Sequence, residues 1–158
     1  MNTSRLIIRE FTEQDIDIIY EINNHPECII FNGWDSMSKQ ECHEVLIRWM
    51  SKYELSSAEG VFCVEEIESG LKVGMTFIVD HKKSKEYEIG FRFKRDMWGN
   101  GYAQEITNYF TKYAAEELKA KAIFAEVDVL NNNSRRIFEK LKFEEYEHPF
   151  GPEGILFS

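Results

Sequence analysis

Residues 86–127 constrain the fold more than any other segment, because they carry strand, helix and strand signals in succession. Glu86–Phe93 alternates polar and apolar side chains and predicts a strand, and Ala122–Val127 predicts a second one. Between them, apolar side chains recur at helical spacing from Ile106 to Leu118. A strand, a helix and a strand in this order lie with the two strands parallel. The sequence therefore predicts a parallel strand pair with a helix packed across it.

The other expected elements complete a mixed sheet around this unit. A strand, two amphipathic helices and two strands of a meander come first, at 5–11, 12–24, 38–53, 61–66 and 73–80. A short helix and two strands follow the unit, at 132–141, 143–147 and 155–157. Meander strands pair antiparallel. The expected fold is an α+β sandwich of one domain, residues 1–158, with a mostly antiparallel sheet, a central parallel pair and helices on both faces.

Composition narrows the class of protein. The 158 residues, 43% of them hydrophobic, suffice for one core. No apolar run of about 18 residues and no apolar leader occurs, so neither membrane spanning nor secretion is expected. The three cysteines lack a C-x-x-C spacing, which suits neither a disulfide framework nor a structural zinc site. We expect a cytoplasmic protein.

Charge is distributed unevenly along the chain. The net charge of -9 argues against general binding to nucleic acid or anionic lipid. Residues 1–70 hold 5 basic and 14 acidic side chains, whereas residues 71–158 hold 14 of each. Within the neutral half, Lys82–Arg95 is locally basic, with six basic side chains against Glu86 and Glu88.

The segment Trp98–Ala103 follows a predicted strand, precedes a predicted helix and contains two glycines. Free N–H groups at such a helix start suit a pyrophosphate, and glycines let the backbone approach it closely. The segment lacks the third glycine of a dinucleotide-binding motif, since position 104 is Gln104, and it lacks the Gly-Lys-Ser/Thr of a P-loop. A tight turn with a helix cap is the alternative interpretation.

Three segments together resemble the GNAT superfamily of N-acetyltransferases, and within it the RimJ/RimL-like branch. They are Arg5–Arg9 with Thr12 and Asp15, Glu88–Phe91 with residues 98–103 and Glu105, and Asn131–Arg136 with Glu139–Phe143. Their order and spacing match the family from residue 5 to residue 143. Trp98 departs from the superfamily pattern, which has Gln or Arg there, and Lys142 stands where the family usually has glycine.

The resemblance implies an acetyl-CoA site between strands 86–93 and 122–127, which splay apart after a bulge in this family. Pantetheine would pair with the backbone of residues 91–93, and the pyrophosphate would lie on the amides of residues 99–103. Arg92, Lys94 and Arg95 would help to attract the polyanionic cofactor, unless they form a solvated charge run. The implied cofactor-binding residues are Phe91, Arg92, Phe93, Trp98, Gly99, Asn100, Gly101, Tyr102, Ala103, Asn131, Ser134 and Arg136.

Candidate catalytic groups follow from the needs of amide formation. Strand alternation places Glu88 in mid-strand beside the expected thioester, where it can deprotonate the amine through a water. Glu126 is the competing base, and a structural ion pair is the alternative role for Glu88. Many family members supply the acid from a tyrosine at the position of Phe138, which has no proton to give. Ser134 is the candidate acid near the sulfur, or else a helix-start residue that bonds the backbone.

The resulting prediction is an N-acetyltransferase that moves acetyl from acetyl-CoA to a primary amine by direct attack in a ternary complex, without a metal. Trp34 and Glu88 are the expected acceptor-binding residues; for Trp34 this follows from the resemblance, and packing is its alternative role. A protein N-terminus, a polyamine, an aminoglycoside-like drug and an amino acid all remain as acceptors. A non-catalytic acetyl-CoA-binding module is the alternative function. The sequence leaves the oligomeric state open, a homodimer included.

Overall fold

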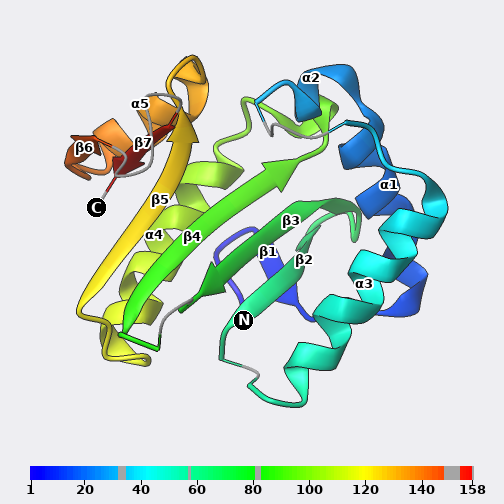
Figure 1. The fold of residues 1–158 in the computed structure, drawn as a ribbon, viewed down its shortest axis with the longest axis horizontal. Coiled ribbons are helices and arrows are strands. Elements are labelled where there is room, and N and C mark those ends of the chain that lie inside the picture. Colours follow the sequence, from blue (N-terminus) through cyan, green and yellow to red (C-terminus); the bar gives the residue numbers. More distant parts are fainter. Residues whose placement is uncertain (32–34, 57, 81–82, 148–153, 158) are drawn as a thin grey trace.

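The computed structural model describes residues 1–31, 35–56, 58–80, 83–147 and 154–157. Within them, seven strands form one sheet in the order β1-β2-β3-β4-β5-β7-β6 (Figure 1). The strands are β1 (Leu6–Arg9), β2 (Gly60–Glu66), β3 (Lys72–Val79), β4 (Glu86–Phe93), β5 (Ala122–Asp128), β6 (Glu145–Glu147) and β7 (Gly154–Phe157). The helices are α1 (Ile16–Asn24), α2 (Pro26–Ile29), α3 (Lys39–Tyr53), α4 (Tyr102–Glu116) and α5 (Asn132–Lys140), with short 3₁₀ turns η1 (Glu13–Asp15) and η2 (Arg95–Met97).

Strand pairing confirms the predicted mixed sheet. β1 to β4 pair antiparallel in chain order, and β4 pairs with β5 in parallel. β5 then pairs antiparallel with β7, which also pairs with β6. The single parallel pair sits in the middle of the sheet because α4 carries the chain across the sheet from β4 to β5.

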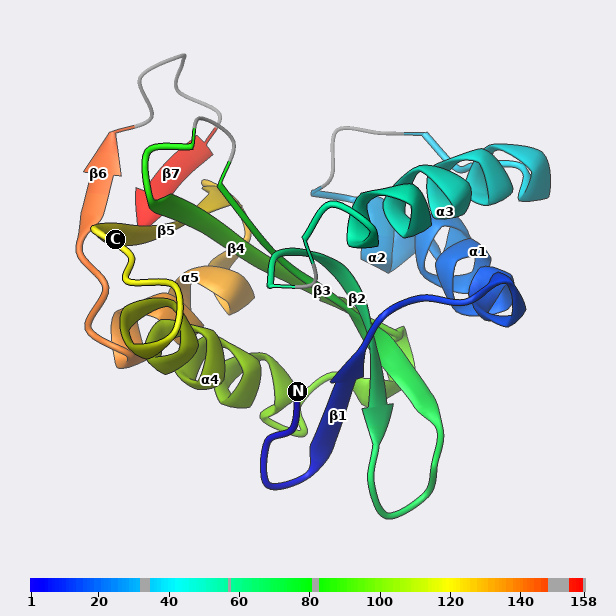
Figure 2. The ribbon, with the colours of Figure 1, turned by 90° about the horizontal axis from the view of Figure 1, so that it is seen from below.

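Helices cover both faces of the sheet, with α1–α3 on one side and α4 and α5 on the other (Figure 2). The core under α4 contains Ile106 and Phe110 of that helix with Ile89 and Phe93 of β4. On the opposite face, apolar side chains of α1 and α3 cover Cys63 and Met75 of the sheet. β4 therefore directs alternate side chains to two different environments, as its sequence predicts.

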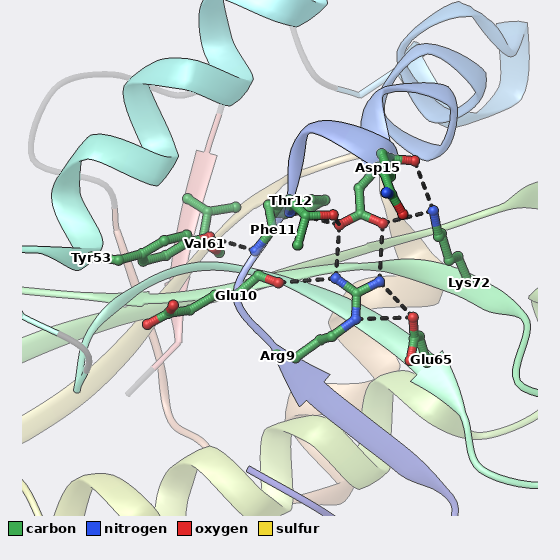
Figure 3. A network of polar contacts seen from close by, with 10 residues as sticks. Arg9, Glu10, Phe11, Thr12, Asp15, Tyr53, Val61, Glu65 and Lys72 are labelled. Atoms are coloured by element: carbon green, nitrogen blue, oxygen red, sulfur yellow. Dashed lines mark hydrogen bonds and ion pairs between the residues drawn. The ribbon is translucent and has the colours of Figure 1, made fainter.

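A buried charge network fixes the turn from β1 to α1 (Figure 3). Asp15, 1% exposed, accepts hydrogen bonds from Arg9 Nη1 at 2.7 Å and Nη2 at 2.9 Å. Lys72 Nζ lies 2.7 Å from the same carboxylate, and Thr12 donates its backbone N–H to it at 2.7 Å. Arg9 also donates to Glu65 of β2. The network ties β1, β2, β3 and the start of α1 together.

The segment between the two expected helices, 12–24 and 38–53, contains a short helix for which the sequence analysis gives no element. This helix is α2, which begins at Pro26 and is capped by the His25 side chain, whose Nδ1 accepts from the Glu27 amide at 3.3 Å. Proline suits the first helical position because its missing N–H has no helical partner there. Trp34 lies outside the described residues. Among the helices of the described part of the chain, none has the length and apolar character to cross a membrane.

Candidate active site

The two parallel strands separate in the middle of the sheet. β4 and β5 pair only from Glu86 opposite Ala122 to Glu88 opposite Phe124. Beyond that point β4 stays paired with β3 as far as Phe93, while β5 pairs with β7 from Ala125 onward. Figure 1 shows the two strands diverging toward their C-terminal ends. The backbone of β4 beyond Glu88 therefore faces an open wedge, where an extended ligand can add as a strand.

The expected bulge in β4 is absent from this wedge. The pairing of β3 with β4 keeps one register from Val79 opposite Glu88 to Gly74 opposite Phe93. The strands separate because β5 turns to its second partner, β7, rather than because of an extra residue in β4. That expectation was wrong, although the splay itself is present.

The glycine loop at the end of β4 leads directly into α4. Gly99 and Gly101 have φ angles of +82° and +79°, a region in which side chains other than glycine are strained. Gly101 is the N-cap residue of the 15-residue helix α4. None of the backbone N–H groups from Gly99 to Ala103 donates a hydrogen bond to another described residue. These unused donors lie at the positive end of a helix dipole, an arrangement that suits an anion, so residues 99–103 are the candidate anion site.

The side chains of the loop stabilise its conformation and add no further donors to the backbone N–H groups of residues 99–103. Trp98 Nε1 donates to the Phe93 carbonyl at 3.0 Å, which fastens the loop to the end of β4. Asn100 Nδ2 donates to the Met97 carbonyl at 3.0 Å. Tyr102 is buried in the core, and its hydroxyl donates to Glu66 of β2. Trp98, Asn100 and Tyr102 thus direct their side-chain donors to the protein, and the loop offers a ligand its backbone amides.

The basic side chains before the loop bind the first two helices. Arg92 Nη1 donates to Asn23 Oδ1 at 3.2 Å, and burial lowers the pKa of Arg92 below its ordinary value. Lys94 pairs with Glu21 at 3.1 Å, and Arg95 pairs with Glu27 at 2.7 Å. These contacts place Arg92 beside α1 and engage Lys94 and Arg95 with acidic partners. The segment therefore anchors α1 and α2 beside the end of β4.

Glu88 lies on the face of the sheet that α1–α3 cover. It is half-buried, and it lines a pocket of about 260 Å³ together with Trp49 and Lys52 of α3, Gly60 and Val61 of β2, and Phe77 and Val79 of β3. On β5, the neighbours of Glu126, Ala125 and Val127, are buried in the core under α4. Alternation therefore points the exposed Glu126 to the same face as Glu88. The structure leaves both carboxylates as candidate bases.

Phe77 is a wall of this pocket that the sequence analysis missed. It lies opposite Gly90 in the pairing of β3 with β4. A Cβ at Gly90 would lie 2.3 Å from the Phe77 ring, closer than packed atoms approach, so the ring occupies the place of the missing side chain. Gly90 in mid-strand was the available signal, since a glycine there often marks a close approach. Phe77 thus covers β4 between Glu88 and Arg92.

The start of α5 lies at the same edge of the sheet as the glycine loop, because both follow the C-terminal ends of parallel strands (Figure 1). Asn131 is the N-cap residue, and its Oδ1 accepts from the Ser134 amide at 3.1 Å. The Ser134 side chain is half-buried, and its hydroxyl has no hydrogen-bond partner among the described residues. Arg136 is exposed on the same helix.

Phe138 occupies the place where many relatives supply an acid. It is 2% exposed, and its ring lies 6.0 Å from that of Phe91 on β4 and 5.3 Å from that of Phe157 on β7. Phe138 therefore packs against the splayed part of β4 and offers no proton there. Ser134, one turn earlier on α5, has the nearest hydroxyl on that helix.

Two features of the site together indicate a class of protein. They are the open backbone edge of β4 and the row of amides at the start of α4. The edge suits an extended arm with amide groups, and the amides suit a pyrophosphate at the end of that arm. Coenzyme A combines both chemical features. The site therefore has the form of an acyl-CoA-dependent transferase.

Comparison with known proteins agrees with this class. The model of the acetyltransferase (GNAT) domain family matches residues 5–144. YoaA, an uncharacterized N-acetyltransferase of Bacillus subtilis, is 25% identical over 157 residues, which cover 99% of this chain and 85% of YoaA. A GNAT-family acetyltransferase from Bacillus anthracis superposes with a TM-score of 0.83 at 22% identity, covering 99% of this chain and 94% of the other. The ribosomal L7/L12 alpha-N-protein acetyltransferase RimL, solved with CoA, gives a TM-score of 0.80 at 10% identity, covering 98% and 93%.

The chain belongs to the GNAT acetyltransferase family, and it is an N-acetyltransferase that uses an acyl-CoA donor. The family and the named relatives favour an enzyme over a non-catalytic acetyl-CoA-binding module.

Proposed function

We propose that the protein binds acetyl-CoA with its pyrophosphate on the amides of residues 99–103 and its pantetheine arm along β4 beyond Glu88. The observation that carries the proposal is the row of amides from Gly99 to Ala103 without hydrogen-bond partners among the described residues. Gly99, Asn100 and Gly101 are exposed, so water can bind these donors in the free protein, and the helix dipole favours an anion in its place. The wedge between β4 and β5 supports the same placement, because pairing ends at Glu88.

In this proposal an acceptor amine attacks the acetyl carbonyl directly. Glu88 takes a proton from the amine through a water, the new N–C bond forms, and the C–S bond breaks with the electron pair on sulfur. The Ser134 hydroxyl passes a proton to the leaving thiolate and takes up another from solvent. Backbone N–H groups of the splayed part of β4 stabilise the oxyanion, and one such donor is worth roughly 3 kcal/mol of barrier. Phe138 and the unengaged Ser134 hydroxyl support placement in the RimJ/RimL-like branch.

CoA is expected to stabilise the folded protein because it binds the native state alone. The stabilisation is about 2.7 kcal/mol at a hundredfold excess of CoA over its dissociation constant. A thermal melt with and without millimolar CoA measures it. An unchanged melting temperature contradicts the proposed cofactor.

Gly101→Val tests the position of the cofactor in the same experiment. Valine at a φ of +79° strains the loop, so the melting temperature should no longer respond to CoA although the protein still folds. Gly70→Val is the matched control. Gly70 has a φ of +68° and nothing within 4 Å of an added Cβ, so this variant carries the same backbone strain in the turn between β2 and β3, outside the loop, and should keep the response.

We also propose that the acceptor is a cationic primary amine, either a small molecule or a protein N-terminus. The excess acidity of residues 1–70 supports this, since α1–α3 cover the face on which Glu88 lies. Ion pairs neutralise part of the excess, those of Glu21, Glu27 and Asp17 included.

Electrostatic attraction of this kind predicts a salt dependence. The Debye length falls from ~30 Å at 0.01 M salt to ~10 Å at 0.1 M, so kcat/KM for the best acceptor should fall by about 10-fold over this range. Thiol release from acetyl-CoA across a panel of amines and N-terminal peptides identifies that acceptor. A neutral or acidic best acceptor with salt-independent kinetics contradicts the proposal.

A further inference from the structure

Arg5, the residue before β1, contacts both the glycine loop and helix α4. Its Nη1 donates to the Asn100 carbonyl at 2.9 Å. Its Nε donates to Glu105 Oε2 at 2.7 Å, and Nη2 lies 2.7 Å from the same oxygen. The guanidinium also lies 4.9 Å from the centre of the Tyr102 ring. The Arg5 side chain thus joins the N-terminal segment to the glycine loop and to the first turn of α4.

Glu105 holds Arg5 in this position. Its other oxygen accepts from Thr3 Oγ1 at 2.5 Å, from Ser4 Oγ at 3.0 Å and from the Arg5 amide at 2.9 Å. Burial alone would raise the pKa of Glu105, but the hydrogen bonds from Thr3, Arg5 and Ser4 outweigh it and bring the pKa to about 2. The carboxylate is therefore ionised at neutral pH and fixes residues 3–5 against the first turn of α4.

The bond to the Asn100 carbonyl determines where the next amide points. In a planar trans peptide the C=O and N–H groups point in opposite directions. Because Arg5 binds the carbonyl of the Asn100–Gly101 peptide, the Gly101 N–H points away from Arg5. Gly101 is the N-cap residue of α4, and its N–H is among the donors without a described partner. Arg5 thus aims a donor of the anion site.

Arg5 also changes the charge beside that site. Glu105 lies in the first turn of α4, where a bare carboxylate would repel a bound pyrophosphate. The guanidinium is in direct contact with this carboxylate and neutralises it. Both effects of Arg5 favour an anion on the loop.

We propose that Arg5 is a positioning residue for cofactor binding, which orients the Gly101 amide and screens the charge of Glu105. The inference rests on the proposed placement of acetyl-CoA. Arg5 acts on the cofactor through the loop, since its own guanidinium binds Asn100 and Glu105. Lysine cannot replace it, because one ammonium group does not reproduce the fork that reaches both partners.

The test compares CoA with pantetheine, which has the arm but no pyrophosphate. Arg5→Lys and Arg5→Gln should raise the Kd for CoA by about 10- to 100-fold, the size expected for lost hydrogen bonds between charged groups. Calorimetry measures CoA binding, and an NMR titration measures pantetheine binding, which should be unchanged. In a separate NMR titration with CoA, the shift of the Gly101 amide signal should shrink in both variants. Arg48→Gln, at an exposed arginine of α3, removes the same charge elsewhere and should bind CoA as the wild type does.

Each outcome decides between the two proposals. Wild-type affinity of Arg5→Lys for CoA, or an equal loss of CoA and pantetheine binding, overturns the role of Arg5 and leaves the cofactor placement standing. The second result would show a merely structural role, which includes a failure to fold. No CoA binding by the wild-type protein overturns the proposed function instead.

Discussion

Asp15→Asn is expected to destabilise the fold by about 3 to 5 kcal/mol, because it removes the buried negative charge that Arg9 and Lys72 share and leaves Arg9 with Glu65 alone. Arg9 and Lys72 both contact the Asp15 carboxylate at 2.7 Å, and the side chain is 1% exposed. Urea denaturation at pH 7 measures the free energy of unfolding. For a domain of this size, the melting temperature should fall by roughly 10 °C.

Asp17→Asn is the matched control, two residues along the chain. Asp17 is 81% exposed and its partner Lys39 is 3.5 Å away, so the change should stay within about 0.5 kcal/mol. Equal effects of the two variants would contradict the role assigned to the network.

The network also predicts how the stability depends on pH. Burial acts to raise the pKa of Asp15, but the hydrogen bonds from Arg9, Lys72 and Thr12 bring it well below its ordinary value. A lowered carboxyl pKa stabilises the fold above the unfolded-state pKa of about 3.9, and this contribution is lost as pH falls toward the folded-state value. The difference between wild type and Asp15→Asn should therefore shrink below about pH 4.

Local patterns predicted most of the fold. β4 has the predicted bounds of residues 86–93, and α3 at Lys39–Tyr53 lies within the expected range of 38–53, with Ser38 and Glu41 forming a capping box at its start. The wedge could not be derived in the same way. It depends on β5 pairing with β7, about 30 residues further along the chain, and no local pattern in either strand specifies that partner.

The candidate site shows the same division between local and distant information. The sequence predicted Gly99 and Gly101 as part of a candidate anion-binding loop, because the strand, loop and helix signals are adjacent in the sequence. The sequence did not predict the contacts of Arg92, Lys94 and Arg95, since their partners lie about 70 residues away on α1 and α2. The same basic residues could attract a polyanionic cofactor or form ion pairs within the protein. Only the packing of the folded chain distinguishes these two roles.

The connection between β4 and α4 therefore serves two sides of the molecule. Its first residues hold α1 and α2 through Lys94 and Arg95, and its last residues form the proposed anion site. Trp98 links the two parts, because its indole binds Phe93 while Arg95 lies 4.8 Å from its ring. The helices on the acceptor face and the proposed cofactor site are thus attached to one short segment.

Glu88→Gln is expected to lower turnover by about 10²- to 10⁴-fold with the CoA affinity nearly unchanged, because it removes the proposed base and keeps the side-chain shape. The residual activity should recover at higher pH, where more of the free amine is already neutral. Pre-steady-state and steady-state thiol release, measured from pH 6 to about pH 10, test both statements. Ser134→Ala should cause a smaller loss without that recovery, since raising the pH supplies no proton to sulfur.

Two other glutamates test whether Glu88 specifically is the base. Glu86→Gln is the matched control, an exposed carboxylate two residues earlier on β4, and it should leave turnover near the wild-type value. Glu126→Gln tests the competing base on β5, which faces the same side of the sheet as Glu88. Near-normal turnover of Glu88→Gln at neutral pH, with a large loss in Glu126→Gln, would move the base to β5. Near-normal turnover of both variants would leave bulk water as the base, since the amine would then lose its proton before it reaches the pocket of Glu88.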